Sequence, residues 1–291
     1  MKDRGLRPKK RFSQNFLRDQ DTIRFIVEFF EPGEGDLVLE IGAGDGTITM
    51  PLWDRGCEVR AFELERSMIA LLKQRLGGRD RFWIEEGDFL KVDLPSYLKE
   101  AGRFKRTFIV GNLPYAITTA ILEKVLPEIG LTDGMLLMTQ LEVAKRLTAN
   151  PGDSDYARHS LMAQTYSEAE LVRKVLNTCF IPPPRVASAL VHFKKKTPVD
   201  IGNPKWFRVL TKAAFSQRRK KLANSMWAFF KPYMAREKVN AILAECEVDP
   251  EARAQTLPLD SFVRLAHAFQ REMGGEFTPL SQQNGEEHAE E

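Results

Sequence analysis

Short apolar runs alternate with amphipathic stretches through the first two thirds of the 291-residue chain. Runs such as LVLEI and TFIV end close to glycine or asparagine, which is typical of buried strands, and the stretches between them carry apolar residues at helical spacing. The predicted strands are 37–41, 58–62, 82–85, 107–110, 134–139, 170–176 and 187–193. The predicted helices among them are 47–55, 65–76, 118–129, 142–149 and 160–166.

Strands that alternate with helices predict an α/β fold with a mostly parallel seven-stranded sheet, because right-handed crossovers place the helices over both faces. The last two strands are joined through Cys179–Pro184, which predicts an antiparallel hairpin at the sheet edge. From Asn203 onward the pattern is helical only, over 205–215, 220–229, 235–245 and 259–272. We therefore expect a basic N-terminal segment (1–19), an α/β domain (20–197), a small all-α domain (198–273) and an acidic, disordered tail (274–291).

Composition narrows the class of protein. The chain is 43% hydrophobic and 29% charged, which fits a globular protein and excludes an intrinsically disordered chain. No apolar run approaches the ~20 residues that span a bilayer, so we expect no membrane partner. Cys57, Cys179 and Cys246 lie too far apart for a disulfide framework or a metal site. These features predict a cytoplasmic protein without a metal cofactor.

The charge is unevenly distributed. Residues 1–18 hold seven Lys and Arg residues against one acid, and residues 205–236 hold nine without any acid. Aromatic residues such as Phe12, Phe16 and Trp206 are interleaved with them. Solvated surface charge would explain either segment alone, but two such segments with aromatic residues favour a nucleic-acid partner.

A glycine loop, Gly42 to Gly46 (GAGDG), follows the first predicted strand and opens a helix. Glycine lets a backbone turn sharply and approach a ligand closely. The dinucleotide fingerprint requires a third glycine where this chain has Thr47. Glu40 lies just before the loop, and an acid there suits a ligand with an ammonium and a sulfonium group. The loop therefore favours S-adenosylmethionine.

Two acidic residues follow the next two strands. Glu63 lies 21 residues after Gly42, where a carboxylate can accept the hydroxyls of a ribose. Asp88 could accept the exocyclic amine of an adenine. Each has an ordinary alternative, as a helix cap or a turn residue. Three such features at the carboxyl ends of consecutive strands favour a cofactor site in which Gly42, Gly44, Glu63 and Asp88 take part.

The segment Asn112 to Tyr115 (NLPY) follows the fourth strand. Pro114 fixes the backbone and biases Leu113 toward an extended conformation, which exposes backbone carbonyls. The Asn112 side-chain oxygen and one carbonyl could accept both hydrogens of an aromatic amine and free its lone pair for methylation. Tyr115 offers a ring for stacking the base. The alternative is an ordinary turn, but the pattern favours amine methylation.

The chain resembles the KsgA/RsmA family of ribosomal RNA small-subunit adenine dimethyltransferases from about Lys9 to Glu272. The motifs that carry the resemblance are KRFSQNFL (10–17), EIGAGDG (40–46), Glu63, GD (87–88), NLPY (112–115), FIPPPRVAS (180–188) and AFSQRRKKL (214–222). The resemblance implies a Rossmann-like methyltransferase fold with S-adenosylmethionine as methyl donor and S-adenosylhomocysteine as product. It also implies that Asn15, Leu17 and Asn112 contact the cofactor. Phe180 would stack with Tyr115 about a flipped adenine, because N6 is inaccessible in a stacked helix.

The expected RNA contacts are basic residues of three segments, namely Lys9, Lys10, Arg11, Arg185, Arg218, Arg219, Lys220 and Lys221. The resemblance implies dimethylation of two adjacent adenines in the 3'-terminal hairpin of 16S rRNA, within the 30S subunit or its precursor, with a role in 30S biogenesis. We expect the enzyme to be monomeric. Ala120 replaces a proline found in many relatives. Two alternatives remain: an RNA-binding assembly factor without turnover, and an Erm-type 23S rRNA methyltransferase.

Overall fold

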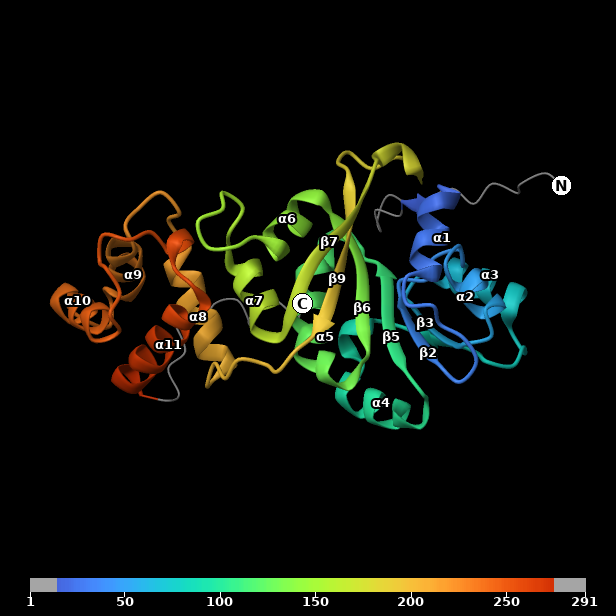
Figure 1. Cartoon of the computed structure of the whole chain (residues 1–291), viewed down its shortest axis with the longest axis horizontal. Helices are drawn as coiled ribbons and strands as arrows, with labels where there is room; N and C mark the ends of the chain where they lie inside the picture. Colours follow the sequence, from blue (N-terminus) through green and yellow to red (C-terminus); the bar gives the residue numbers. More distant parts are fainter. Residues whose placement is uncertain (1–14, 275–291) are drawn as a thin grey trace. The chain divides into compact units, whose positions relative to one another are not determined.

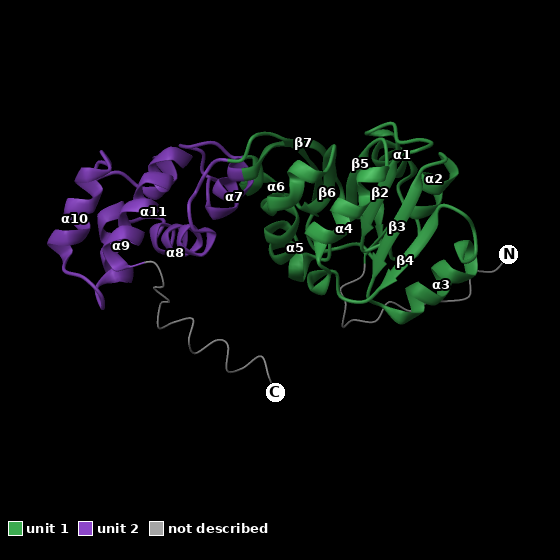
Figure 2. Ribbon diagram, turned by 90° about the horizontal axis from the view of Figure 1, so that it is seen from below, with its two compact units in different colours: residues 1–148, 166–198 green, residues 149–165, 199–291 purple. Residues whose placement is uncertain are grey.

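The computed structural model describes residues 15–274, which fall into two compact units (Figure 2). Unit 1 holds residues up to 148 and residues 166–198, and unit 2 holds residues 149–165 and the chain from 199 onward. The sequence division near Pro198 assigned 149–165 to the α/β domain, whereas here they group with the helical unit. The expected roles of Lys9, Lys10 and Arg11, and the expected disorder of the tail beyond Gly274, fall outside the described residues.

Unit 1 is built on a seven-stranded sheet in the order β4-β3-β2-β5-β6-β9-β7 (Figure 1). The first five of these strands are parallel, and β9 runs antiparallel to both β6 and β7. This confirms the predicted mostly parallel sheet with a hairpin at its edge. The strands are β2 (Leu37–Ile41), β3 (Glu58–Glu63), β4 (Phe82–Glu86), β5 (Thr107–Asn112), β6 (Gly134–Gln140), β7 (Ser167–Val175) and β9 (Ser188–Lys195).

The strand order reverses direction between β2 and β5. The chain passes from β2 outward to β3 and β4 and then returns to β5 and β6 on the other side. Right-handed crossovers therefore place the helices of the two halves on opposite faces, and the reversal opens a crevice at the carboxyl ends of β2 and β5. The helices of this unit are α1 (Gln20–Glu28), α2 (Thr49–Asp54), α3 (Arg66–Leu76), α4 (Leu94–Glu100), α5 (Thr118–Val125) and α6 (Leu141–Thr148).

Strand β2 lies at the centre of the core, and all five of its residues are buried. A strand covered on both faces needs a continuous apolar run rather than an alternating one, which explains LVLEI. Each fully buried Leu or Ile contributes about 1.5–3 kcal/mol. The sequence pattern does not predict two helices, α1 and α4. They begin at the caps Asp19 and Asp93, whose carboxylates accept hydrogen bonds from the backbone N–H groups of Thr22 and Ser96.

A second, two-stranded sheet joins distant parts of unit 1. Strand β1 (Phe16–Leu17) pairs antiparallel with β8 (Phe180–Ile181), which lies in the connection between β7 and β9. Leu17 and Phe180 are partners in this register, and both are buried. The pairing holds the N-terminal segment against the loop that carries Phe180.

Unit 2 is helical, as the sequence pattern predicts from Asn203 onward. Its helices are α7 (Arg158–Tyr166), α8 (Pro204–Ala214), α9 (Leu222–Phe230), α10 (Arg236–Glu245) and α11 (Leu259–Met273). Aromatic pairs fill its core: the rings of Phe215 and Phe262 stack with centroids 5.6 Å apart, and those of Phe230 and Phe269 stack at 4.7 Å. Within the described part of the chain, no helix has the length and apolarity required to cross a membrane.

Candidate active site

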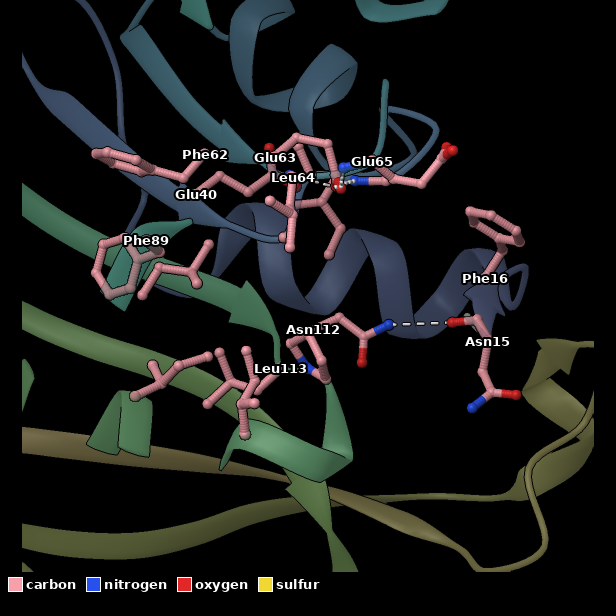
Figure 3. A pocket seen from close by; sticks show the side chains of 18 of the residues that line it. Asn15, Phe16, Glu40, Phe62, Glu63, Leu64, Glu65, Phe89, Asn112 and Leu113 are labelled. Atoms are coloured by element: carbon pink, nitrogen blue, oxygen red, sulfur yellow. Dashed lines mark hydrogen bonds between the residues drawn. The ribbon is translucent and has the colours of Figure 1, made fainter. Parts of the chain in front are cut away.

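A cavity of about 390 Å³ lies at the carboxyl ends of the parallel strands, at the reversal between β2 and β5 (Figure 3). The loops after β2, β3, β4 and β5 line it together with the N-terminal segment. This volume lies within the range of small-ligand sites, roughly 300–1,000 Å³. Of the predicted cofactor residues, the lining includes Asn15, Leu17, Gly42, Gly44, Glu63, Asp88 and Asn112. It also includes Leu113, Pro114 and Tyr115.

The glycine loop forms the wall above β2. Gly42, Gly44 and Gly46 have φ angles of +75°, +55° and +84°, which residues with side chains rarely adopt. The N–H of Gly42 donates to the carbonyl of Phe62 at 2.9 Å, so the loop is tied to the end of β3. At Gly42 and Gly44, which line the cavity, the backbone consequently borders it without an intervening side chain.

The Glu63 carboxylate is held by backbone donors. Its Oε2 accepts the N–H of Gly44 at 2.7 Å, and its Oε1 accepts the N–H groups of Leu64 and Glu65 at 2.9 Å each. The side chain is 8% exposed. These bonds fix the carboxylate at the junction of the glycine loop and β3, facing the cavity as the ribose assignment requires.

Asp88 caps a short helix, which is the ordinary alternative to its predicted role as acceptor of an adenine amine, but it also lines the cavity. Its Oδ1 accepts the N–H of Leu90 at 3.0 Å and so caps a 3-10 helix (Phe89–Lys91). The residue is half-buried and also lines the cavity. A carboxylate has further lone pairs, so this cap leaves capacity for a ligand amine.

Glu40 differs from the other acids of the cavity. It is 1% exposed, and its carboxyl group is hydrogen-bonded to the Thr49 hydroxyl at 2.6 Å. Burial raises the pKa of Glu40 to about 8, and the negative charges of the nearby Glu63 and Asp45 act in the same direction. The hydrogen bond from Thr49 acts in the opposite direction. The raised pKa favours the uncharged form of this side chain. The structure therefore does not support the expectation that Glu40 supplies negative charge to a cationic ligand.

The NLPY loop borders the opposite side of the cavity. The Asn112 amide nitrogen donates to the carbonyl oxygen of Asn15 at 3.3 Å, so the acceptor oxygen Oδ1 points away from Asn15 (Figure 3). The Leu113 N–H donates to the Met138 carbonyl at 3.1 Å, which fixes the loop to β6. The Tyr115 hydroxyl and the Ser188 hydroxyl are 2.7 Å apart, and this hydrogen bond holds the half-buried ring in place.

The N-terminal segment closes the cavity, and two of its residues escaped prediction. The Phe16 ring lies close to Gly44: a Cβ on that glycine would be 3.5 Å from the ring. Arg18 donates to the Asp45 carboxylate at 2.6 Å and to the Thr47 hydroxyl at 2.9 Å. Their positions follow from tertiary contacts with the glycine loop, which the residue pattern does not express.

Phe180 and Arg185 lie on the connection between β7 and β9. Phe180 is 1% exposed, packs beside Leu17 and is not among the residues that line the cavity within the described chain. Its predicted stacking on a base therefore requires its ring to become accessible. Arg185 is exposed, as an RNA contact would require.

The basic run of unit 2, residues 218–221, contains side chains that bind other parts of the unit and side chains that are exposed. The Arg218 guanidinium donates to the backbone carbonyls of Ser154 and Tyr156 at 2.6 and 3.1 Å, and so holds the 149–157 segment. Lys221 forms an ion pair with Glu251. Arg219 and Lys220 are exposed. Among residues 15–274, no cluster of three His, Cys, Asp or Glu side chains could hold a metal ion.

An open, mostly parallel sheet binds its ligand at the topological switch, where this cavity lies. The solved structures described below share this fold and identify it as a Rossmann-like methyltransferase fold of the class that uses S-adenosylmethionine. The chain belongs to the ribosomal RNA adenine dimethylase family, whose model matches residues 5–271. It is therefore an rRNA adenine dimethyltransferase.

Similar proteins cover almost the whole chain. It is 39% identical over 263 residues to the ribosomal RNA small subunit methyltransferase A of Pseudomonas aeruginosa, covering 90% of this chain and 94% of that protein. The protein of the same name from Methylococcus capsulatus is 38% identical over 260 residues, covering 89% and 96%.

Solved structures show the same fold. A dimethyladenosine transferase from Plasmodium falciparum matches with a TM-score of 0.70 and 25% identity, over 88% of this chain and 98% of that one. The 23S rRNA methyltransferase ErmE matches with a TM-score of 0.60 and 27% identity, over 87% and 99%.

Proposed function

We propose that this enzyme transfers methyl groups from S-adenosylmethionine to N6 of two adjacent adenines in the 3'-terminal hairpin of 16S rRNA. The products are N6,N6-dimethyladenosine and S-adenosylhomocysteine. The names of its similar proteins, which refer to the small subunit, support this choice of RNA. We further propose that it acts as a cytoplasmic monomer on the 30S subunit or its precursor and takes part in 30S biogenesis.

The donor half of the cavity fits S-adenosylmethionine. Gly42 and Gly44 present backbone without a side chain, and the Glu63 carboxylate, fixed by three N–H donors, would accept the ribose hydroxyls. Asp88 would accept the adenine amine of the cofactor, and Asn15 and Leu17 would close the pocket. When bound, S-adenosylmethionine supplies a methyl group activated by a positively charged sulfur.

The acceptor half is the NLPY loop. An aromatic amine is a poor nucleophile because its lone pair is delocalised into the ring. Asn112 Oδ1 and a backbone carbonyl of the loop would accept the two amine hydrogens, which localises the lone pair on nitrogen. Tyr115, pinned through its hydroxyl, would stack on the base. The amine proton can leave after the methyl transfer, so no strong general base is needed. Most of the acceleration then comes from orientation and preorganised dipoles.

One observation carries this proposal: Glu63 and Asp88 on one side and Asn112 on the other line a single cavity. A protein that only bound RNA would need neither a donor pocket nor an amine acceptor beside it. The exposed Arg185, Arg219 and Lys220 suit phosphate contacts that position the RNA.

The test is incubation of the purified protein with radiolabelled S-adenosylmethionine and unmethylated 30S particles, followed by mapping of the label. We expect label on N6 of two adjacent adenines near the 3' end of 16S rRNA. Label on 23S-derived RNA offered in parallel would support the Erm-type alternative. Binding of the particles without label would support the assembly factor.

A further inference from the structure

The connection between β7 and β9 carries an exposed apolar surface. Leu176, Ile181 and Val186 are 63%, 61% and 47% exposed. The other exposed large hydrophobic residues of the described chain are scattered, at Met50, Leu64, Trp83 and Leu131. We call the segment 176–186 the apolar tip. Exposed apolar surface is typical of interaction sites, and these three side chains lie on one short segment, which makes the tip a candidate for one.

Strand pairing places the apolar tip at the edge of the sheet that holds the cavity. Strand β9 is antiparallel to β6, so its first residue, Ser188, pairs with Gln140 at the carboxyl end of β6. Val175, the last residue of β7, also pairs with Ser188. The tip therefore extends from the same edge as the NLPY loop, and the hydrogen bond between Ser188 and Tyr115 links the two.

The two-stranded sheet connects the tip to the cavity wall. Ile181 is the direct partner of Phe16, whereas Phe180 is the partner of the buried Leu17. Directly opposed residues lie on the same face of a strand pair, and successive residues alternate between faces. Ile181 thus lies on the same face as Phe16, and Phe180 on the same face as Leu17. Because Phe16 and Leu17 both line the cavity, the strand pair joins the tip to the cavity wall.

The conformation of the tip is also restrained. Pro182, Pro183 and Pro184 fix three successive φ angles. The Cys179 carbonyl accepts the N–H groups of Arg18 and Asp19 at 2.8 and 3.3 Å, which anchors the start of the tip. A preorganised apolar surface loses little conformational entropy on binding.

We propose that the apolar tip packs against the bases and riboses that become exposed when the target adenine leaves the RNA helix. This rests on the proposed function. Extrusion of a base uncovers the faces of its stacked neighbours, and apolar wedges are a known means of occupying such gaps. RNA is favoured over a protein partner because Ile181 pairs with Phe16 of the cavity wall and because Arg185, between Pro184 and Val186, is exposed, as a phosphate contact requires.

The first experiment compares wild type with the double variant Ile181→Ser plus Val186→Ser. Leu131→Ser is the matched control, since Leu131 is 42% exposed on a different segment (Leu126–Leu131). We expect kcat/KM for 30S particles to fall roughly 10-fold in the double variant, the scale of one lost base contact. Affinity for S-adenosylhomocysteine should stay unchanged, as should both properties of the control.

The second experiment identifies the occupant by placing a photo-reactive amino acid at position 186 and irradiating the complex with 30S particles. Cross-links to 16S rRNA near the methylated adenines are expected. Cross-links to a ribosomal protein or to a second copy of the enzyme would overturn the proposal, as would wild-type kcat/KM in the double variant. If the wild type itself fails to methylate 30S particles, the proposed function fails, irrespective of the tip.

Discussion

The sequence predicts functional residues in two regions: the carboxyl edge of the sheet in unit 1 and the basic run in unit 2. The two regions differ in whether their predicted residues lie together in the structure. At the sheet edge, glycines, acids and the NLPY loop from four separate strands meet around one cavity. In the run from Arg218 to Lys221, neighbouring cations have different partners: Arg218 holds backbone carbonyls, Lys221 holds Glu251, and Arg219 is exposed.

The difference shows what determines a side chain's role. Residues after parallel strands converge because strand pairing fixes the backbone, so their position follows from the fold itself. The partner of a cation on a loop depends on local packing. A backbone carbonyl of the same unit can accept its hydrogen bonds just as a phosphate can. Charge alone therefore predicts the surroundings of a side chain less well than position after a strand does.

The largest effect is expected from Asn112→Ala. The variant loses the Oδ1 acceptor for the amine, and removing one preorganised polar group from a reacting centre costs about 10²–10³ in kcat. Turnover with labelled S-adenosylmethionine and 30S particles measures this loss. Ile117→Val, which changes another cavity residue without polar loss, is the control and should stay within about threefold of wild type.

Glu63→Gln tests the opposite side of the same cavity. The amide retains one acceptor oxygen, but its NH2 group replaces an oxygen that accepts backbone N–H groups. It also loses the charge that strengthens hydrogen bonds to ribose, each of which contributes about 1.5–3 kcal/mol when the acceptor is charged. We expect calorimetry to show affinity for S-adenosylhomocysteine reduced roughly 10- to 100-fold, with 30S binding retained. Equal weakening of both ligands would mean that Glu63 supports the site as a whole rather than the ribose.

How far the sequence predicts this molecule depends on the kind of feature. Leu37–Ile41 has the predicted bounds because a buried strand must be apolar throughout. Helix α1 was missed although Asp19 caps it. Strand β1 and the contacts of Phe16 and Arg18 could not be predicted, because they depend on a partner more than 150 residues away and on the folded glycine loop. Glu40 attracts attention as an acid, but only its burial in the structure reveals its raised pKa.

In unit 2, the double variant Arg219→Ala plus Lys220→Ala is expected to weaken 30S binding about 10-fold at low salt. Log affinity falls with log salt, and each lost phosphate contact should make this slope less steep by about 0.7–0.9. Binding measured at several salt concentrations separates this from a structural effect. An unchanged slope would mean that both side chains face solvent in the complex.

Arg218→Ala should have the smallest effect on RNA binding and a distinct effect on stability. The variant removes a charged donor from the carbonyls of Ser154 and Tyr156, at a cost of about 1 kcal/mol in the free energy of unfolding. A loss of this size lowers Tm by roughly 4 °C in a domain of this scale. Arg219→Ala should leave Tm unchanged while reducing RNA affinity. The two neighbouring variants should therefore change different quantities, Tm for Arg218→Ala and RNA affinity for Arg219→Ala. If Arg218→Ala instead weakens binding in a salt-dependent way at unaltered Tm, the guanidinium leaves its carbonyls for a phosphate, and the basic run acts as one electrostatic unit.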